Sequence, residues 1–384
     1  MTSISEQAMV TLSETTLGEE EALAAAEVVR GGWLTQGPRV QRFEEAFAAM
    51  VGGVEAVAVA NCTVGLELAF EALGVRAGDE VIVPSLTFVA TANAVMRCGA
   101  TPVFADVQSP TDLTLSASDV AKKITAKTKL ICPVHYAGFA VDLDALTEAA
   151  QGIAMVEDCA HSPGATLGGR GLGSIGAIGA FSFFANKNMT TGEGGMLTTH
   201  DPELAQRLRR TRAHGMTTST LERHRGHAFT YDVERVGTNA RMDELRAAIG
   251  MIQLQKLSEN NIARAQRVGW YRERLGPHAR LVIPFGQHTR GESVHHLFVV
   301  LLPEGTDRAA VMAHMRAAGV QTSVHYPPTH RFSAYESVRA TLPVTDAVAP
   351  RLLTLPLHPL LTHEQLLRVC DALESALVAV STLC

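Results

Sequence analysis

Short apolar runs alternate with longer amphipathic segments between about residue 40 and about residue 200. A short apolar run bounded by turn residues is typical of a buried strand, whereas apolar residues three and four positions apart indicate a helix. Strands that alternate with helices predict βαβ units, so we expect an α/β fold with a mainly parallel sheet. The strand-like runs are AVAVA (56–60), EVIVP (80–84), TPVFADV (101–107), KLICPV (129–134), GIAMVED (152–158) and AFSFF (180–184).

The second half of the chain has a different pattern, with longer helical segments and few strands. RMDELRAAIGMIQLQKL (241–257) begins one long predicted helix that continues through NNIARAQRVGWYRERL (260–275). Farther along, HLFVVLL (296–302) predicts a strand, DRAAVMAHMRAAG (307–319) predicts a helix, and we expect a final helix from about Glu364. The long helix is therefore expected to pass the chain from one domain to another.

Two domains follow from this change of pattern. We expect a large α/β domain at residues 1–250 and a small C-terminal α+β domain at residues 251–384, which a chain of 384 residues can accommodate. The polar, irregular segment from His214 to Val236 predicts a long loop, and long loops often carry function.

Composition and charge exclude several classes of protein. The net charge of -6, with both signs interspersed, provides no basic face for a phosphate backbone, so we expect no nucleic-acid binding. The N-terminus MTSISEQAMV lacks the charged start and apolar core of a signal peptide, and no apolar run approaches the ~18 residues of a membrane span. We therefore expect a soluble cytoplasmic protein. Its scattered cysteines predict reduced thiols and no metal site: Cys62, Cys98, Cys132, Cys159, Cys370 and Cys384.

One glycine-rich motif is set aside because of its context. GLGSIG (171–176) matches the dinucleotide-binding pattern G-x-G-x-x-G, and Glu193 lies about twenty residues beyond it. That function requires a strand before the motif and a helix after it. Here the polar segment GATLGGR precedes the motif and the strand-like AFSFF follows it. A dinucleotide site is therefore disfavoured.

A second candidate anion site lies in NCTVGLELAF, where a strand ends and a helix begins. Thr63 and Gly65 fall in the first helical turn, where free N–H groups and the helix dipole attract a phosphate. Simple N-capping by Asn61 or Thr63 is the alternative interpretation.

Further candidate residues follow the ends of other strands. Asp158 closes the run IAMV, and its carboxylate either caps a turn or pairs with a cation. Phe88, after another strand, either covers a flat ring or fills the core. Lys187 heads the turn-rich stretch KNMTTGEGG. Pyridoxal 5′-phosphate (PLP) needs a lysine for a Schiff base, an acid at the pyridine nitrogen, an aromatic face and a helix N-terminus for its phosphate. All four occur at strand ends.

The chain resembles the DegT/DnrJ/EryC1/StrS family of sugar aminotransferases over nearly its whole length. The resemblance implies the fold type I architecture of aspartate aminotransferase, with a mainly parallel seven-stranded sheet in the large domain. The segments that carry it are GGWLTQGPRVQRFEEAFA, PSLTFVATANAV, CGATPVFADV, PVHYAG, VEDCAHSPGA, FSFFANKNMTTGEGGML, GTNARMDELRAAIGMIQLQKL and LPLHPLLT.

The resemblance assigns roles around the cofactor ring. Lys187 is implied to hold PLP as a Schiff base and then to shuttle the proton, and a partly desolvated lysine beside a cation has a lowered pKa. Asp158 is implied to bind the pyridinium nitrogen, and Phe88 is implied to stack on the ring. His161 matches a position beside the ring, with a structural hydrogen bond to the Asp158 loop as the alternative.

The resemblance also assigns the phosphate site. Ser182 and the first-turn amides of Thr63 and Val64 match the phosphate-binding group of the family. Asn239, in GTNAR, matches a residue that reaches the neighbouring subunit's phosphate. A homodimer with shared active sites is therefore implied.

The rival reactions within the family differ at particular positions of its sequence pattern. In the related sugar 3-dehydratases a histidine replaces the Schiff-base lysine, whereas this chain keeps Lys187. ANKNMTTGEGG and PVHYAG resemble the sugar 4-aminotransferases rather than the 3-aminotransferases, although Phe184 stands where histidine is common. We therefore expect transfer of an amino group from L-glutamate, through pyridoxamine phosphate, to C4 of a dTDP-4-keto-6-deoxyhexose. A 3-aminotransferase, or another keto-sugar or cyclitol aminotransferase, is the alternative.

A non-enzymatic alternative comes from relatives that are regulators or membrane-signalling proteins with the same fold. Such a sensor does not need Lys187 and Asp158 together, so the pair favours an enzyme.

Overall fold

A computed structural model describes residues 9–218, 226, 230–278 and 280–381 of the chain. In this part of the chain, seven strands form one sheet in the order β1-β11-β10-β7-β6-β2-β3. The pairs are parallel except that β11 runs antiparallel to both β1 and β10. The mainly parallel sheet is therefore confirmed. Its strands are β1 Glu55–Val59, β2 Glu80–Pro84, β3 Thr101–Ala105, β6 Thr128–Ile131, β7 Ala154–Asp158, β10 Ile178–Ser182 and β11 Gly195–Thr199.

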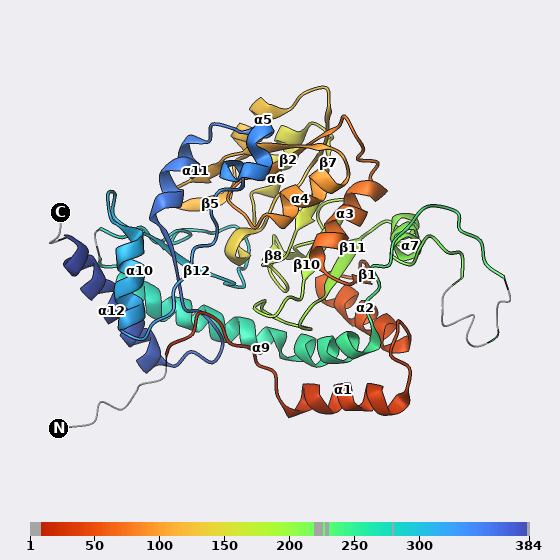
Figure 1. Ribbon diagram of the computed structural model, residues 1–384, viewed down its shortest axis with the longest axis horizontal. Helices are drawn as coiled ribbons and strands as arrows, with labels where there is room; N and C mark the ends of the chain where they lie inside the picture. The colour runs from red at the N-terminus through yellow and green to blue at the C-terminus, as the bar shows by residue number, and fades with distance from the viewer. Residues whose placement is uncertain (1–8, 219–225, 227–229, 279, 382–384) are drawn as a thin grey trace.

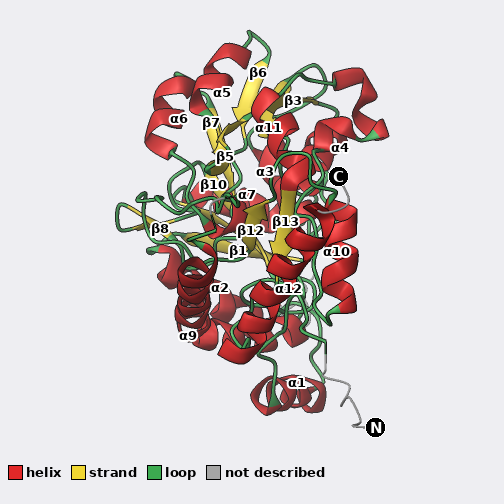
Figure 2. Cartoon of the chain, turned by 90° about the vertical axis from the view of Figure 1, so that its left-hand side faces the viewer, coloured by secondary structure: helices red, strands yellow, loops and turns green. Residues whose placement is uncertain are grey.

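Side chains alternate between the two faces of this sheet, because successive strand residues point in opposite directions. Ile82 and Met155 join one apolar core, whereas their neighbours Val83 and Val156 join the other. Figure 2 shows α5 and α6 on one side of the strands and α3 and α4 on the other. The result is an α/β sandwich with two apolar cores.

Capping residues explain where several of these helices begin. Side chains of Asn61, Ser116, Asp142, Asp201 and Asp243 each accept a backbone N–H from the first turn of the following helix. The helices up to the long α9 are α1 Glu19–Gly31, α2 Pro38–Val51, α3 Cys62–Ala72, α4 Ala90–Arg97, α5 Ala117–Lys123, α6 Leu143–Ala150, α7 Pro202–Thr211 and α9 Glu244–Leu275.

The second unit is built at the far end of α9, as Figure 1 shows. A third core there contains Val268 from α9 together with residues of β12 (Phe298–Leu301), α10 (Arg308–Ala317) and α12 (His363–Ser381). Residue 250, the predicted end of the large domain, lies inside α9, so that boundary stays a prediction. The other elements are β13 Leu352–Leu355, which pairs with β12, the hairpins β4 Val107–Ser109 with β5 Asp112–Leu115 and β8 Thr166–Leu167 with β9 Arg170–Gly171, and α11 Pro343–Val348.

The predicted elements agree closely with this fold. Each apolar run overlaps an observed strand, and the long helix and the final helix are confirmed. The run 101–107 is divided at Asp106, whose carboxylate accepts the N–H groups of Val344 and Thr345 at 2.9 and 2.8 Å. The predicted loop 214–236 is irregular where it is described, and residues 219–225 and 227–229 lie outside the described part.

Two further findings concern helices and cysteines. In the described part of the chain, no helix is both long and apolar enough to cross a bilayer. Five cysteines are free among the described residues, and Cys384 lies outside them.

Candidate active site

The sheet brings most of the predicted site residues to one edge. Asp158 and Ser182 are the last residues of the parallel strands β7 and β10, and α3 begins directly after β1. Phe88 follows the end of β2, and Lys187 lies in the turn after β10. The carboxyl edge of an open α/β sheet is where such folds bind ligands.

Asp158 is a buried carboxylate with unused hydrogen-bonding capacity. Its side chain accepts the Thr91 hydroxyl at 2.8 Å and the Ala160 N–H at 3.1 Å, and it is 5% exposed. Burial raises the pKa of Asp158, although these two hydrogen bonds and the Lys187 cation offset part of the effect. A carboxylate accepts more than two hydrogen bonds, so this one can receive a cationic N–H donor.

Lys187 is a cation close enough to this carboxylate for the two charges to interact. Its backbone N–H donates to the Phe184 carbonyl at 3.0 Å, which closes the turn that carries the side chain. Burial lowers the pKa of Lys187 to about 8, against the opposing attraction of Asp158. An amine with such a pKa is readily deprotonated near neutral pH, as a nucleophile or a base requires.

His161 and Tyr326 form a wall of the site. The Nδ1 atom of His161 accepts the Ala137 N–H at 3.3 Å, so Nε2 carries the proton and donates it to the Tyr326 hydroxyl at 3.0 Å. Burial lowers the pKa of His161 well below its ordinary value, and Lys187 lowers it further, so the ring is neutral. The Phe88 ring lies 5.8 Å from the Tyr326 ring and is 55% exposed. This exposure leaves the Phe88 face free to cover a flat ligand.

Tyr326 and Thr91 were not predicted from the sequence. Tyr326 lies 165 residues from His161 along the chain, and no spacing links the two. Thr91 carried a weak signal, because it lies in the segment PSLTFVATANAV that follows β2.

The candidate phosphate site lies where α3 meets the end of β10. Gly195 pairs with Ser182, and a Cβ atom on Gly195 would lie 2.8 Å from the Cys62 backbone nitrogen. Glycine at this position therefore lets the start of β11 pack closely against the first turn of α3. Within that turn the Val64 N–H donates to Asn61 Oδ1 at 2.9 Å, so the N-capping interpretation is confirmed for this amide.

Asn239 differs from the other predicted residues, because its side chain is exposed. It precedes Ala240, whose carbonyl accepts the Ala60 N–H at 2.8 Å. A cavity of about 700 Å³ opens beside this segment and is lined in part by Ala213 and Arg241. None of the predicted cofactor residues lines that cavity.

The residues at the sheet edge fit PLP. Asp158 has capacity for a ring N–H, Lys187 is a readily deprotonated amine, and α3 begins at this edge with a helix N-terminus, which attracts a phosphate.

Comparisons with known proteins agree with this geometry. The model of the DegT/DnrJ/EryC1/StrS aminotransferase family matches residues 15–374. The chain is 38% identical over 367 residues to the spore coat polysaccharide biosynthesis protein SpsC of Bacillus subtilis (strain 168). The matched region covers 93% of this chain and 94% of SpsC.

Solved structures show the same relationship. The aminotransferase TlmJ from Streptoalloteichus hindustanus superposes with a TM-score of 0.91 at 35% identity, covering 97% of this chain and 100% of TlmJ. The putative sugar aminotransferase Spr1654 from Streptococcus pneumoniae superposes in its PMP form with a TM-score of 0.91 at 28% identity, covering 98% of this chain and 99% of Spr1654. Its PLP form is also a structural neighbour, with a TM-score of 0.90 at 27% identity, covering 97% of this chain and 99% of Spr1654.

Proposed function

Because the chain belongs to the DegT/DnrJ/EryC1/StrS aminotransferase family and is a PLP-dependent sugar aminotransferase, we propose that it acts on C4 of a dTDP-4-keto-6-deoxyhexose. L-Glutamate is the proposed amino donor, and the product is a dTDP-4-amino-4,6-dideoxyhexose. The observation that carries the reaction class is Lys187 beside Asp158 at the carboxyl edge of the sheet. The segments ANKNMTTGEGG and PVHYAG support position C4 over C3.

The proposed roles follow from the position of each side chain. Bound PLP supplies an electron sink that lets a proton leave the donor's Cα atom. Lys187 takes that proton on Nζ, since its lowered pKa suits a base near neutral pH. Asp158 holds the proton of the pyridine nitrogen, Phe88 covers one face of the ring, and His161 orients Tyr326 beside it.

The proposed phosphate site uses the other end of the same edge. Ser182 and the first-turn N–H of Thr63 donate hydrogen bonds to the phosphate. The Val64 N–H, which donates to Asn61 Oδ1 at 2.9 Å, joins them only by exchanging that partner for the phosphate. We propose that Asn239 completes this site in the partner subunit of a homodimer. Its exposed side chain and the adjacent cavity support an interface at this surface.

Subunit exchange tests the shared site. Lys187→Ala and Asn239→Asp are each expected to be inactive, the second because a carboxylate facing a phosphate is repelled. In a mixed dimer, one site collects both lesions and the other keeps Lys187 and receives the partner's wild-type asparagine. We expect up to half of the wild-type activity to return for each mixed dimer. Mixed dimers as inactive as both parents would show that Asn239 serves its own chain.

A substrate panel tests the proposed sugar. The purified enzyme is incubated with L-glutamate and with matched pairs of nucleotide 4-keto and 3-keto sugars, and products are identified by mass spectrometry and NMR. We expect amination at C4 of the dTDP-4-keto-6-deoxyhexose. Preferred amination at C3, or of a cyclitol, would favour the alternative. A regulatory protein would aminate none of these substrates.

A further inference from the structure

The glycine-rich loop GLGSIG (171–176) binds an anion, and this anion is one of the protein's own side chains. The Glu157 carboxylate accepts the backbone N–H groups of Gly173 at 2.9 Å, Ile175 at 2.8 Å and Gly176 at 2.7 Å. Successive N–H groups that converge in this way form an anion-binding concavity. A Cβ on Gly176 would lie 2.8 Å from the Met155 carbonyl oxygen, so glycine permits this close approach.

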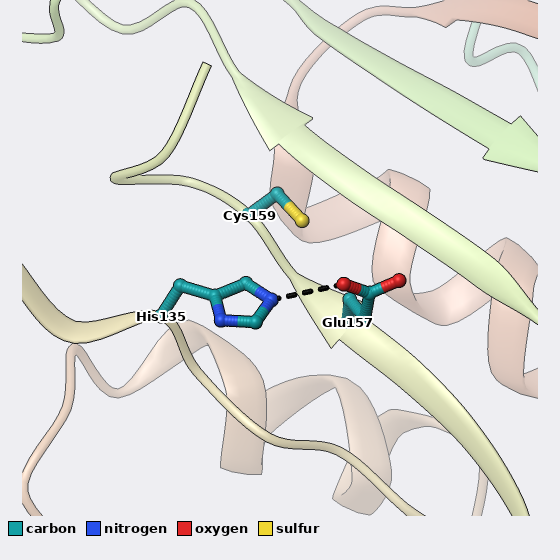
Figure 3. A group of neighbouring side chains, drawn as sticks. All are labelled: His135, Glu157 and Cys159. Atoms are coloured by element: carbon teal, nitrogen blue, oxygen red, sulfur yellow. Dashed lines mark hydrogen bonds and ion pairs between the residues drawn. The ribbon is translucent and has the colours of Figure 1, made fainter. Parts of the chain in front are cut away.

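His135 completes the hydrogen bonding of Glu157, as Figure 3 shows. The Nδ1 atom of His135 accepts the Val141 N–H at 3.2 Å, so the ring proton is on Nε2, which lies 3.0 Å from the Glu157 carboxylate. Both side chains are fully buried. In this arrangement the imidazole Nε2–H donates to a buried carboxylate. Burial acts to raise the pKa of Glu157, but the His135 and backbone hydrogen bonds outweigh it and lower that pKa.

A metal site is the alternative interpretation of this group. The ligand atoms of His135, Glu157 and Cys159 lie within 4.8 Å of one another. However, the hydrogen bond from Val141 occupies Nδ1 of His135, and the proton donated to Glu157 occupies Nε2. Burial also raises the pKa of Cys159, which disfavours the thiolate that binds metals. The group therefore acts through hydrogen bonds rather than as a ligand set.

The His135–Glu157 pair is directly connected to the backbone of Asp158. The His135 N–H donates to the Asp158 carbonyl at 3.1 Å, and the Asp158 N–H donates to the Pro133 carbonyl at 2.8 Å. The backbone of the PVHYAG segment is therefore bonded to the end of β7, and the side chain of His135 is bonded to the residue before Asp158. Any shift of this strand end would move the Asp158 carboxylate. Groups that contact a cofactor need such support to stay within about 0.5 Å of a productive position.

We infer that His135 and Glu157 are positioning residues, which hold the end of β7 so that Asp158 meets the pyridine nitrogen of PLP. This inference rests on the proposed role of Asp158. It gives the glycine-rich loop a function, because that loop supplies three of the donors that fix Glu157.

The test measures PLP binding rather than turnover. Cofactor-free protein is titrated with PLP and followed by visible absorption, and its melting temperature is measured separately. Glu157→Gln places an amide N–H against backbone donors, so we expect PLP to bind about tenfold more weakly or worse, with a shifted pH midpoint of the bound cofactor's absorption. Glu148→Gln is the matched control, because Glu148 is exposed on the nearby α6.

A second pair of variants covers the possibility that Glu157→Gln does not fold. His135→Gln keeps an N–H donor for Glu157 and an acceptor for Val141, whereas His135→Leu keeps neither. We expect His135→Gln to bind PLP within about threefold of wild type and His135→Leu to bind about tenfold more weakly. Equal PLP affinity in both variants, or a fall in melting temperature with unchanged affinity and pH midpoint, would overturn the inference.

Two parallel measurements separate the possible failures. If Asp158→Asn leaves PLP affinity unchanged, the proposed role of Asp158 is wrong. If Asp158→Asn weakens binding and the His135 and Glu157 variants do not, only the positioning role is wrong. Stoichiometric metal in the purified wild-type protein that disappears in His135→Leu would also overturn the inference, in favour of a metal site.

Discussion

Two consecutive carboxylates on β7, Glu157 and Asp158, have opposite environments although both are buried. Among the described residues, Glu157 receives four hydrogen bonds, from three backbone N–H groups and His135. Asp158 receives two, from Thr91 and Ala160. Burial alone would raise the pKa of both carboxylates. The pKa of Glu157 is nevertheless lowered, whereas that of Asp158 is raised.

The difference separates a carboxylate whose hydrogen bonds come from the chain itself from one that can accept a further donor. Alternation along the strand directs Glu157 to the side of the Met155 core and Asp158 to the side of the Val156 core. On the first side the protein supplies every donor. On the second side capacity remains, and Lys187 is the nearby cation. A buried carboxylate with unused capacity is therefore a better marker of a binding site than burial alone.

The largest expected effect comes from removing the cation that faces Asp158. Lys187→Ala should reduce turnover at least about a thousandfold, because the base and the attachment point for the cofactor are both lost. Borohydride should fix PLP to wild-type Lys187, as a mass increase on the peptide that contains it, and should fix none in the variant. Lys256→Ala is a control, because that lysine pairs with Glu20 and Glu21 rather than with Asp158. Retained turnover in Lys187→Ala would rule out the proposed catalytic role.

Replacing Asp158 directly tests the carboxylate that has unused hydrogen-bonding capacity. Asp158→Asn removes the negative charge that we propose to face the pyridine nitrogen, and each pKa unit of lost support is about 1.4 kcal/mol, or roughly tenfold. We expect a loss of several tens to thousands-fold in rate, measured as steady-state kcat, with little change in the circular dichroism spectrum. Activity within a few-fold of wild type would show that Asp158 does not contact the ring nitrogen.

The sequence indicated Asp158 and Lys187 as candidate site residues but gave no indication of Glu157. Asp158 and Lys187 could be found because their residue types occur at strand ends, where α/β folds bind ligands. Glu157 carried no signal, because its donors come from a loop whose glycines match a dinucleotide pattern. Cys159 and His135 likewise meet only through the fold, which sequence spacing does not reveal.

The parallel strands were predicted better than the antiparallel strand β11 and the C-terminal residue that reaches the site. Apolar runs identified the parallel strands because both of their faces are buried. Strand β11 was missed, because Gly195 and two threonines interrupt the apolar pattern while the strand fits between β1 and β10. Tyr326 was missed because the C-terminal segment reaches the site only through tertiary packing.

A smaller effect is expected when Asp158 loses one of its two donors. Thr91→Val removes the hydroxyl that donates to Asp158 at 2.8 Å and keeps the shape of the side chain. A hydrogen bond to a charged group contributes about 1.5–3 kcal/mol, so we expect PLP to bind about tenfold more weakly. Thr211→Val is the matched control, because the buried Thr211 donates to the Arg207 carbonyl at 2.9 Å within α7. Equal PLP affinity for the two variants would mean that Thr91 does not support Asp158.

The smallest effect concerns the free energy of unfolding, whose dependence on pH distinguishes Asp158 from Glu157. The pKa of Lys187 is about 8 in the folded protein and 10.5 ordinarily, so burial of its charged form costs stability below pH 8. That cost falls as the pH rises from about 8 to 10.5, since the unfolded chain alone still binds the proton. In cofactor-free protein, Lys187→Met should therefore raise the free energy of unfolding by roughly 1–3 kcal/mol at pH 7, and less at pH 10. Urea unfolding across this range measures the difference.

Two backgrounds separate the carboxylates. The gain in free energy of unfolding from Lys187→Met should grow in an Asp158→Asn background, because the carboxylate that favours the ammonium is gone. It should stay unchanged in a Glu157→Gln background, because Glu157 faces the opposite side of β7. A pH-independent difference, or equal responses in both backgrounds, would contradict the contrast between these two residues.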